Sequence, residues 1–514
     1  MRDVPLKTAW LILFLLAAVI ATMRLHTYYE PTERDVACYQ VMAHEMMNGG
    51  RLFEGALIDQ KPPGVECTWA FGQMVAGYGR GSTYFLNVLA AVATLIGVFF
   101  AGRLANGSNK TGLWAAAFWT VVSGHLLLEA NQPNTEVFIN AFTIAGFALF
   151  AGVRGSGSNL KPLLLAGACF AAASLYKHVV VVVPALLCCT NLLLPPEGRS
   201  RRQALGDLLI IGAVGAAAWG AMVSYFAATG RFQNLLMGLV LFNQYYSSTY
   251  THSGGLFSNI LDSLHFAKLF PQALYFSIPL ILLGIAGIVL AVATKKPRPW
   301  VLLAGLAIGT QIEVALPGHL FPHYYQLWFP FLIIGAAWGL EALEMFTGAS
   351  WKVVHAVAAV VLLILITIEA PDYFSRPASE WSRKKYGDIF LRGENLAHLI
   401  NSILLPNETF FQLGPETELY LATERRCPSI LGDSGLNSGP LAVQVTDLMM
   451  KDCTKSPPDL FIFVKWSEVK KTHPIYKWVF ANYVPAPHIV NQDPYFLFVR
   501  KGSALEKRLG EGDK

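Results

Sequence analysis

Charged residues are scarce in this sequence. Only 14% of its 514 residues are Asp, Glu, Lys or Arg, compared with roughly 25% in an average soluble domain, and 54% are hydrophobic. This shortage excludes an ordinary soluble globular protein and favours a membrane protein, with the bilayer as one of its partners. The formal net charge of +5 does not indicate nucleic-acid binding, because most basic residues lie in short connectors between apolar segments.

Several chemical motifs are also absent. The seven cysteines form no CxxC or Cys/His pattern, which excludes a recognisable zinc site or redox motif. No Walker or dinucleotide-type glycine-rich motif occurs, so we expect no use of a nucleotide sugar. No internal repeat is evident, which disfavours transporters built from inverted repeats. Two interpretations stay open for Cys427 and Cys453: one disulfide, if their region lies outside the cytosol, or two free thiols.

Long apolar runs are abundant. A helix that crosses the bilayer needs roughly 20 apolar residues. About eleven such stretches occur, near 8–25, 83–102, 112–130, 137–153, 162–176, 179–194, 206–227, 272–294, 300–316, 326–345 and 353–369. Only Tyr176, Lys177 and His178 separate the fifth stretch from the sixth. One long helix is the alternative there, but two short helices joined by a polar turn fit the crossing length better.

Positive charges in the connectors predict the topology. Every second connector is basic, with Arg2 and Lys7, Arg103 and Lys110, Arg154 and Lys161, Arg199, Arg201 and Arg202, Lys295, Lys296 and Arg298, and Lys352. Because such loops stay in the cytoplasm, we predict a cytoplasmic N-terminus and an extracytoplasmic chain after about residue 370, provided that the number of spans is odd. The first stretch could be a signal peptide cleaved near Ala21, but the alternation works with that stretch retained.

The composition changes near residue 370. We predict an α-helical polytopic membrane domain at 1–370, with a first extracytoplasmic loop at 26–80 and a second large outer region from about Ala228 to Pro271. A soluble extracytoplasmic α/β domain is predicted at 371–514. The β-prone runs Leu460–Val464 (LFIFV) and Tyr495–Val499 (YFLFV), separated by helical-looking segments, support this α/β domain.

The first loop contains two candidate site residues. An amphipathic segment follows Asp35, which predicts a helix along the membrane surface with this carboxylate in its first turn, where the helix dipole favours it. A plain helix cap is the alternative. Lys61 is followed by Pro62 and Pro63, which stiffen the backbone and fix an ammonium that suits a phosphate. An ordinary loop exit is the alternative for this tripeptide.

These residues carry a family resemblance. The string Asp35, Tyr39, Ala43, Gly49, Asp59, Gln60, Lys61, Pro62 and Pro63 resembles the first-loop signature of the GT-C superfamily, in particular its protein O-mannosyltransferase and aminoarabinose lipid A transferase branch. The resemblance covers roughly residues 1–370, and the tail resembles the periplasmic domain of bacterial members. It implies a multi-pass protein of the bacterial inner membrane. Asp35 would be the catalytic base or acceptor-positioning group, and Lys61 would contact the carrier phosphate.

The sequence also departs from this family. Val36 follows Asp35 where a second acidic residue is often found, and Gln60 precedes Lys61 where glutamate is common. A further carboxylate, Glu136, lies in the loop NQPNTE and could simply cap the next helix. The resemblance implies that Glu136 is a second catalytic carboxylate, and Glu129, one turn earlier, is the poorer candidate.

Two further positions are candidates for binding the donor head group. Lys177, in the turn between the fifth and sixth stretches, could snorkel to the interface, but the resemblance implies contact with the carrier phosphate, which His178 could share. His323 and Tyr324 could form an interfacial aromatic belt, but they resemble the HYY-type motif that meets the carrier head group. His319 is a weaker candidate. Asn243 and Gln244, with Tyr245 and Tyr246, could line the acceptor side.

A reaction follows from these assignments. The donor would be a polyprenyl-phosphate-linked sugar, whose phosphate is a good leaving group when nearby cations stabilise it. Asp35 would orient or deprotonate an extracytoplasmic lipid, glycan or protein acceptor, and the anomeric carbon would invert. We predict no strict requirement for a cofactor and leave a divalent metal open, since no convincing ligand cluster occurs. The alternatives are a transporter or flippase, and a scaffold for envelope assembly, but the ionisable residues gather at outer helix ends rather than at mid-membrane depth.

Overall fold

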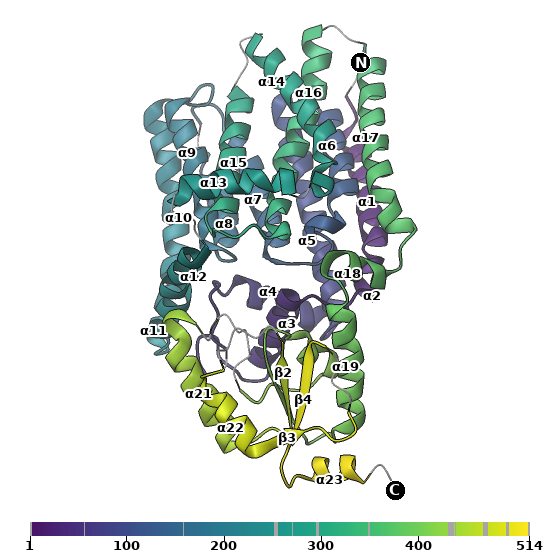
Figure 1. Ribbon diagram of the computed structural model, residues 1–514. Helices are drawn as coiled ribbons and strands as arrows, with labels where there is room; N and C mark the ends of the chain where they lie inside the picture. The colour runs from purple at the N-terminus through teal and green to yellow at the C-terminus, as the bar shows by residue number, and fades with distance from the viewer. Residues whose placement is uncertain are drawn as a thin grey trace. The chain divides into compact units, whose positions relative to one another are not determined.

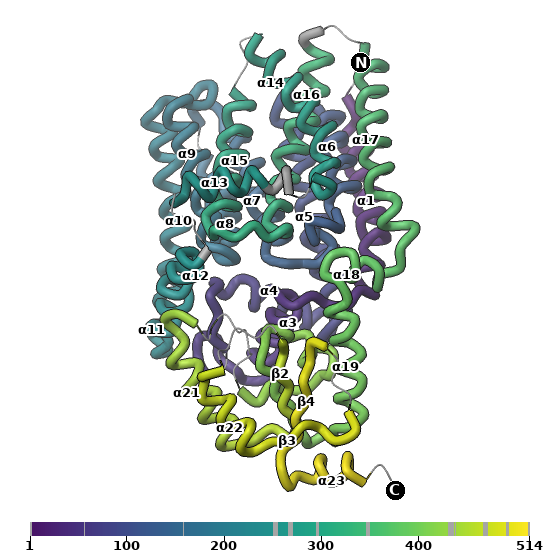
Figure 2. Tube along the Cα trace, viewed as in Figure 1, coloured from purple at the N-terminus to yellow at the C-terminus, as the bar shows by residue number. Residues whose placement is uncertain are grey.

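The computed structural model describes residues 3–55, 57–157, 159–250, 255–269, 271–293, 298–347, 350–429, 436, 438–465, 471–489 and 493–511. Arg2, Lys295 and Lys296, used above for the topology, lie outside these residues. The chain is largely helical, and Figures 1 and 2 follow it from end to end. It divides into two compact units, which are described separately. Unit 1 comprises 1–29, 83–225 and 247–381, and unit 2 comprises 30–82, 226–246 and 382–514.

Unit 1 consists of helices. They are α1 (Leu6–Met23), α2 (Leu25–Tyr29), α5 (Arg80–Gly102), η1 (Arg103–Ala105), α6 (Asn109–Val122), η2 (Leu126–Leu128), α7 (Thr135–Ala151), α8 (Leu160–Ser174), η3 (His178–Val181), α9 (Val182–Leu193), α10 (Arg201–Ala228), α13 (Gly255–Leu269), η5 (Pro271–Leu274), α14 (Ser277–Ala293), α15 (Arg298–Ala315), η6 (Pro322–Leu327), α16 (Trp328–Thr347), α17 (Trp351–Phe374) and α18 (Ala378–Tyr386). Three of these helices include residues of unit 2: α5 begins there, and α10 and α18 end there. α12 (Asn243–Tyr250) begins in unit 2 and ends in unit 1.

Each apolar stretch found in the sequence contains one of these helices. Among the described residues, five helical segments are long and apolar enough to cross a membrane, namely 6–29, 80–105, 201–228, 322–345 and 351–374. Shorter apolar helices occupy 135–151, 160–174, 178–193 and 277–293. α8 and α9 are separate helices, as predicted, rather than one long helix. The polytopic helical character is therefore confirmed, whereas the number of eleven spans stays a prediction.

Small residues bring the unit 1 helices close together. α14 and α16 lie side by side in Figure 1, and a Cβ atom on Gly339 would meet the Leu283 carbonyl oxygen at 2.0 Å. Glycine permits this approach because it has no Cβ atom. Such close backbone packing, rather than hydrophobic burial, is what holds helices together in lipid. The outer faces are apolar, with Phe14 71% and Leu282 62% exposed. Such faces suit contact with lipid chains.

Unit 2 combines helices with a small sheet. Its helices are α3 (Arg34–Met47), α4 (Gly64–Ala76), α11 (Phe232–Leu236), η4 (Met237–Phe242), α19 (Ile389–Ile403), α20 (Glu418–Thr423), η8 (Gly439–Leu441), α21 (Ala442–Lys455), α22 (Pro474–Asn482) and α23 (Ala504–Gly510). The strands are β1 (Phe410–Leu413), β2 (Leu460–Val464), β3 (Tyr483–Pro485) and β4 (Tyr495–Arg500), in the order β1-β2-β4-β3. β1 pairs with β2 in parallel, and the other pairs are antiparallel. Both runs predicted as strands are confirmed.

A hydrophobic core and a polar network hold the sheet in place. Every residue of β2 is buried, and Phe461 packs in a cluster with Met449 of α21 and Val479 of α22. Cys427 and Cys453 belong to the same cluster as free thiols, and burial raises the pKa of each to about 12. The domain boundary predicted near residue 370 stays a prediction.

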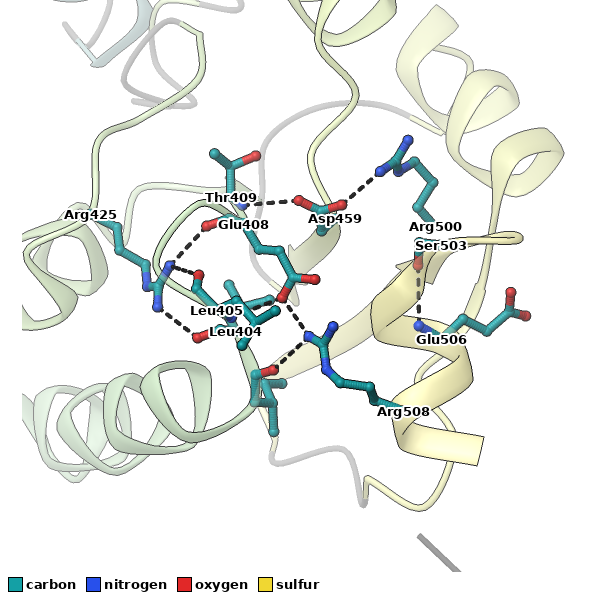
Figure 3. A network of polar contacts seen from close by, with 11 residues as sticks. Leu404, Leu405, Glu408, Thr409, Arg425, Asp459, Arg500, Ser503, Glu506 and Arg508 are labelled. Carbon is teal, nitrogen blue, oxygen red and sulfur yellow. Dashed lines mark hydrogen bonds and ion pairs between the residues drawn. The ribbon is translucent and has the colours of Figure 1, made fainter. Parts of the chain in front are cut away.

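Arginine side chains bind the loop that precedes β1 (Figure 3). The Arg425 guanidinium donates to the backbone carbonyls of Leu404, Leu405 and Glu408. Arg508 of α23 donates to the Glu408 carboxylate at 2.5 Å. These bonds tie the loop after α19 to the last helix of the chain, so the sheet has a fixed frame.

Candidate functional site

The helix α3 begins with an N-cap residue other than Asp35. The Glu33 carboxylate accepts hydrogen bonds from the backbone N–H groups of Asp35 and Val36, both at 2.8 Å. Glu33 is therefore the N-cap, and Asp35 lies in the first turn, half-buried, as predicted. The capping alternative for Asp35 does not apply, because a neighbouring residue already fills that role.

Arg34 ties the start of α3 to the chain near the sheet. Its Nη2 donates to the buried Glu416 carboxylate at 2.7 Å, and the Thr417 hydroxyl donates to the Arg34 carbonyl at 2.9 Å. Burial disfavours the charged guanidinium, but Glu416 and Glu418 outweigh it and raise the pKa of Arg34. The backbone that carries Asp35 is thereby fixed by a residue about 380 positions later in the chain.

Tyr39 of α3 contacts Lys61. It lies one helical turn after Asp35, so the two Cβ atoms are roughly 5–6 Å apart on one face of α3. The Lys61 ammonium donates to the Tyr39 hydroxyl and lies 4.4 Å from the centroid of its ring. The Lys61 ammonium therefore contacts a side chain that lies one helical turn from Asp35.

The chain segment 226–246 holds the loop that carries Lys61. Three of its side chains donate hydrogen bonds to backbone carbonyls of this loop: Arg231 to Leu52 at 2.7 Å, Asn234 to Phe53 at 2.9 Å and Asn243 to Gln60 at 2.6 Å. The backbone also approaches closely at Gly238, where an added Cβ would lie 2.2 Å from the Asp59 carbonyl oxygen. Gly238 lies in a π-helical turn, a geometry frequent at functional sites. Asn243 holds the residue before Lys61, and its place on the acceptor side stays a prediction. Gln244 and Tyr245 are exposed.

Two carboxyl groups, one fully buried and one half-buried, lie close together at this loop. Glu66 of α4 is fully buried, and burial together with the adjacent Asp59 raises its pKa well above the usual range. The backbone N–H of Gln60 donates to the Asp59 carboxylate at 2.5 Å. Glu66 is not among the residues that the sequence pattern singles out. The available signal was an acidic residue on the buried face of α4, together with Val65 and Trp69.

Unit 1 contains the second group of candidate residues. Asn134 caps α7 by accepting from the Thr135 N–H at 2.7 Å, so Glu136 is not the cap. The Glu136 carboxylate is fully buried and forms an ion pair with the Lys177 ammonium. Lys177 lies 3.9 Å from the centroid of the Tyr324 ring. Lys177 therefore contacts two other predicted residues, Glu136 and Tyr324.

His323 completes this group with a carboxylate ranked low from the sequence. Its Nδ1 lies 3.1 Å from the Glu129 carboxylate, and its ring packs edge-on against Tyr324 at 4.8 Å. Glu129 has a left-handed backbone with φ of 59°, which no local sequence pattern announces. His319 stacks on Phe321, and burial, followed by the charge of Lys177, lowers the pKa of His319 to about 4. His178 is exposed.

Each group of residues has a definite chemical capability. In unit 2 the Lys61 ammonium could bind a phosphate, and the Asp35 carboxylate, one helical turn from the tyrosine that Lys61 contacts, could accept a proton from an attacking hydroxyl. In unit 1 Lys177 and His323 are each oriented by a carboxylate, and a bound anion would share the two side chains with these carboxylates. Within the described residues, no cluster of three or more His, Cys, Asp or Glu side chains is arranged to hold a metal ion.

Comparison with known proteins locates the fold. No family model and no curated protein matches the chain. Among solved structures, ArnT from Cupriavidus metallidurans bound to undecaprenyl phosphate has a TM-score of 0.60 at 15% identity, and the match covers 96% of this chain and 99% of that chain. The apo state of that protein has a TM-score of 0.61 at 16% identity, with 96% and 98% covered.

An archaeal enzyme shares this architecture. Oligosaccharyltransferase AglB from Archaeoglobus fulgidus, in complex with an inhibitory peptide and a dolichol-phosphate, has a TM-score of 0.53 at 13% identity, with 96% of this chain and 74% of that chain covered. Identities this low establish the fold alone. The resemblance predicted from the first loop is thereby confirmed at the level of the fold: this chain has the fold of the solved ArnT and AglB structures, and its described residues include five helical segments long and apolar enough to cross a membrane.

Proposed function

We propose that the chain is a glycosyltransferase that moves a sugar from a polyprenyl-phosphate donor to an extracytoplasmic lipid, glycan or protein. One observation carries this proposal, namely the Lys61 ammonium bonded to Tyr39, one helical turn from the Asp35 carboxylate. The bound molecules named for the structural neighbours, undecaprenyl phosphate in ArnT and dolichol-phosphate in AglB, support a lipid phosphate as the carrier.

The reaction would be a single displacement at the anomeric carbon. Asp35 accepts the proton of the acceptor hydroxyl or amine as the acceptor oxygen or nitrogen bonds to that carbon. The bond from this carbon to the phosphate oxygen breaks, and the carrier phosphate leaves with the bonding electrons. Lys61, Lys177, His323 and Tyr324 are assigned to the phosphate and head group, because cations stabilise the charge that develops there. No cofactor is strictly required in this scheme.

Glu136 has a more specific role than the sequence predicted. Its carboxylate is fully buried and already paired with Lys177, and the Thr135 hydroxyl donates to it at 3.0 Å. A carboxylate in this environment orients the ammonium rather than taking a proton from an acceptor. We therefore assign Glu136 as a positioning residue for Lys177 and keep Asp35 as the base.

The proposal includes a topology. The protein would span the bacterial inner membrane eleven times, with a cytoplasmic N-terminus and an extracytoplasmic domain from about residue 371. The first loop would then lie outside the cytosol. Every second connector is basic, which supports this orientation. Cysteines introduced singly at Ser108 and at Ser456, in a variant without the native cysteines, would test it. A membrane-impermeant thiol reagent should label the second in intact cells and the first only after lysis.

Transfer of label tests the activity. Purified protein in proteoliposomes receives radiolabelled polyprenyl-phosphate sugars extracted from bacterial membranes, together with an envelope fraction that contains lipid, glycan and protein acceptors. A transferase moves the label to an acceptor that survives mild acid, and protein-free vesicles do not. If the label crosses the bilayer while staying on the carrier, the protein is a flippase. If the label neither moves nor crosses, the scaffold alternative stands.

A further inference from the structure

A cavity of about 390 Å³ lies in unit 1 where several connectors meet. Its lining comes from η1, the end of α7, the end of α14, the start of α15 and the end of α16, and from the connectors that contain Arg154 and Glu197. None of the candidate catalytic or donor-binding residues lines it. It is therefore separate from the groups of residues described above.

Four charged side chains line the cavity. They are two cations, Arg154 and Arg298, and two anions, Glu197 and Glu341. The Glu341 oxygens accept from the Asn106 amide and, at 2.7 Å, from the Thr111 hydroxyl. Arg298 donates to the Leu194 carbonyl and, at 2.8 Å, to Asn191. The formal charge of the lining is zero, so an occupant that carried charge of only one sign would meet as many repulsive groups as attractive ones.

Arg154 and Glu197 retain unused charge. They lie close in space, because the backbone N–H of Gly155 donates to the Glu197 carbonyl at 2.9 Å. Within the described part of the chain, the two side chains nevertheless form no ion pair with each other. The Arg154 guanidinium makes one hydrogen bond, from Nη2 to the Leu104 carbonyl at 3.1 Å, which leaves its other N–H groups for a ligand. Both residues are exposed.

The remaining walls are apolar and aromatic. Trp300 and Trp338 pack edge-to-face with centroids 5.6 Å apart, and Ala291, Leu302 and Met345 provide aliphatic surface. Nearby, Val292 on α14 is 63% exposed, as expected for a face that contacts lipid. Tryptophan is enriched where acyl chains give way to head groups. A molecule with a polar head and aliphatic chains matches this mixture.

We propose that this cavity binds the head group of a phospholipid that carries both a phosphate and a primary amine, as phosphatidylethanolamine does. Arg154 and Arg298 contact the phosphodiester, and Glu197 accepts hydrogen bonds from the ammonium. The acyl chains lie along the exposed faces of α14 and α16. The site is independent of sugar transfer, and basic pockets between membrane helices are known to hold lipid head groups.

Lipid titration of the full-length protein in detergent tests the proposal. Native mass spectrometry measures retention of phosphatidylethanolamine, phosphatidylglycerol and phosphatidylcholine with identical acyl chains. We expect phosphatidylethanolamine to be retained most strongly, because phosphatidylglycerol lacks an amine and the quaternary amine of phosphatidylcholine cannot donate a hydrogen bond. Arg154→Gln should weaken both phosphatidylethanolamine and phosphatidylglycerol about fivefold, whereas Glu197→Gln should weaken only phosphatidylethanolamine.

Controls separate this site from nonspecific binding. Arg202→Gln removes an exposed arginine that does not line the cavity and should leave retention unchanged. Soluble glycerophosphoethanolamine carries the same phosphodiester and ammonium charges without acyl chains and should bind far more weakly. Equal retention of the three lipids, equal effects of Arg154→Gln and Arg202→Gln, or tight binding of soluble glycerophosphoethanolamine would each overturn the proposal.

Discussion

Gly238 provides a sharp test of how the Lys61 loop is held. A Cβ atom built on Gly238 would lie 2.2 Å from the Asp59 carbonyl oxygen. An ordinary carbon–oxygen contact begins near 3.4 Å, so the alanine variant requires a separation of about 1 Å between the π-helical turn and the loop. Both sides of the contact are backbone, and neighbouring hydrogen bonds from Asn234 and Asn243 hold them together.

Gly238→Ala should therefore move Lys61 relative to Asp35. A displacement of this size costs about 100-fold in rate when reacting groups must be aligned, and the overpacking costs about 1–3 kcal/mol of stability. The assays are label transfer, undecaprenyl phosphate binding by microscale thermophoresis and thermal unfolding in detergent. Gly220→Ala is the matched control, because this helical glycine of α10 faces open space. Wild-type transfer and unchanged unfolding in Gly238→Ala would refute the reasoning, since the loop would then not depend on this contact.

Three further predictions follow from the contacts of Lys61, Glu136 and Glu66. Lys61→Met should weaken undecaprenyl phosphate binding roughly 10- to 100-fold, because a hydrogen bond to a charged group is lost. The control Lys455→Met, at the exposed end of α21, should leave the affinity unchanged. Equal affinities in the two variants would show that Lys61 does not bind the phosphate. Glu136→Gln should lower the free energy of unfolding by about 3–5 kcal/mol, because it removes the carboxylate paired with the Lys177 ammonium, which is only 14% exposed. The double variant Glu136→Gln with Lys177→Met should recover most of that loss. Thermal unfolding of both variants tests this, and a single variant as stable as the wild type would contradict the ion pair. The raised pKa of Glu66 means that folding favours its protonated form, so its contribution to stability is complete below the ordinary glutamate pKa and is lost as pH rises through the raised value. Between pH 5 and 9 the unfolding temperature of the wild type should therefore fall, less so in Glu66→Gln and equally in the control Glu54→Gln, which changes an exposed site. Parallel curves for all three proteins would contradict the assignment.

Much of the helical architecture could be predicted from the sequence because hydrophobic length is a local property. Each apolar run contains a helix, and the polar turn at Lys177 separates α8 from α9 as expected. β2 and β4 were also recognisable, because each is a run of β-branched and aromatic residues. β1 and β3 were not predicted, since strands of four and three residues carry too little pattern.

The parts of the site that sequence could not predict depend on contacts between distant segments. Asn243 binds the Gln60 carbonyl across 183 positions, and Arg34 binds Glu416 across 382. Neither contact leaves a periodic signal. Glu129 was ranked below Glu136 because the left-handed turn that brings it to His323 cannot be read from spacing. The family signature contains both Asp35 and Lys61, and their convergence stays a prediction, supported by the contact of Lys61 with Tyr39.

The central claim is that the Asp35 carboxylate takes the acceptor proton in sugar transfer. Its most direct test is the single-turnover rate of label transfer by Asp35→Asn, measured in proteoliposomes with saturating polyprenyl-phosphate sugar. The substitution keeps the size of the side chain and removes its basicity, so the rate should fall about 100- to 10,000-fold while undecaprenyl phosphate binding and thermal unfolding stay as in the wild type. A near-normal rate in this variant would contradict the account.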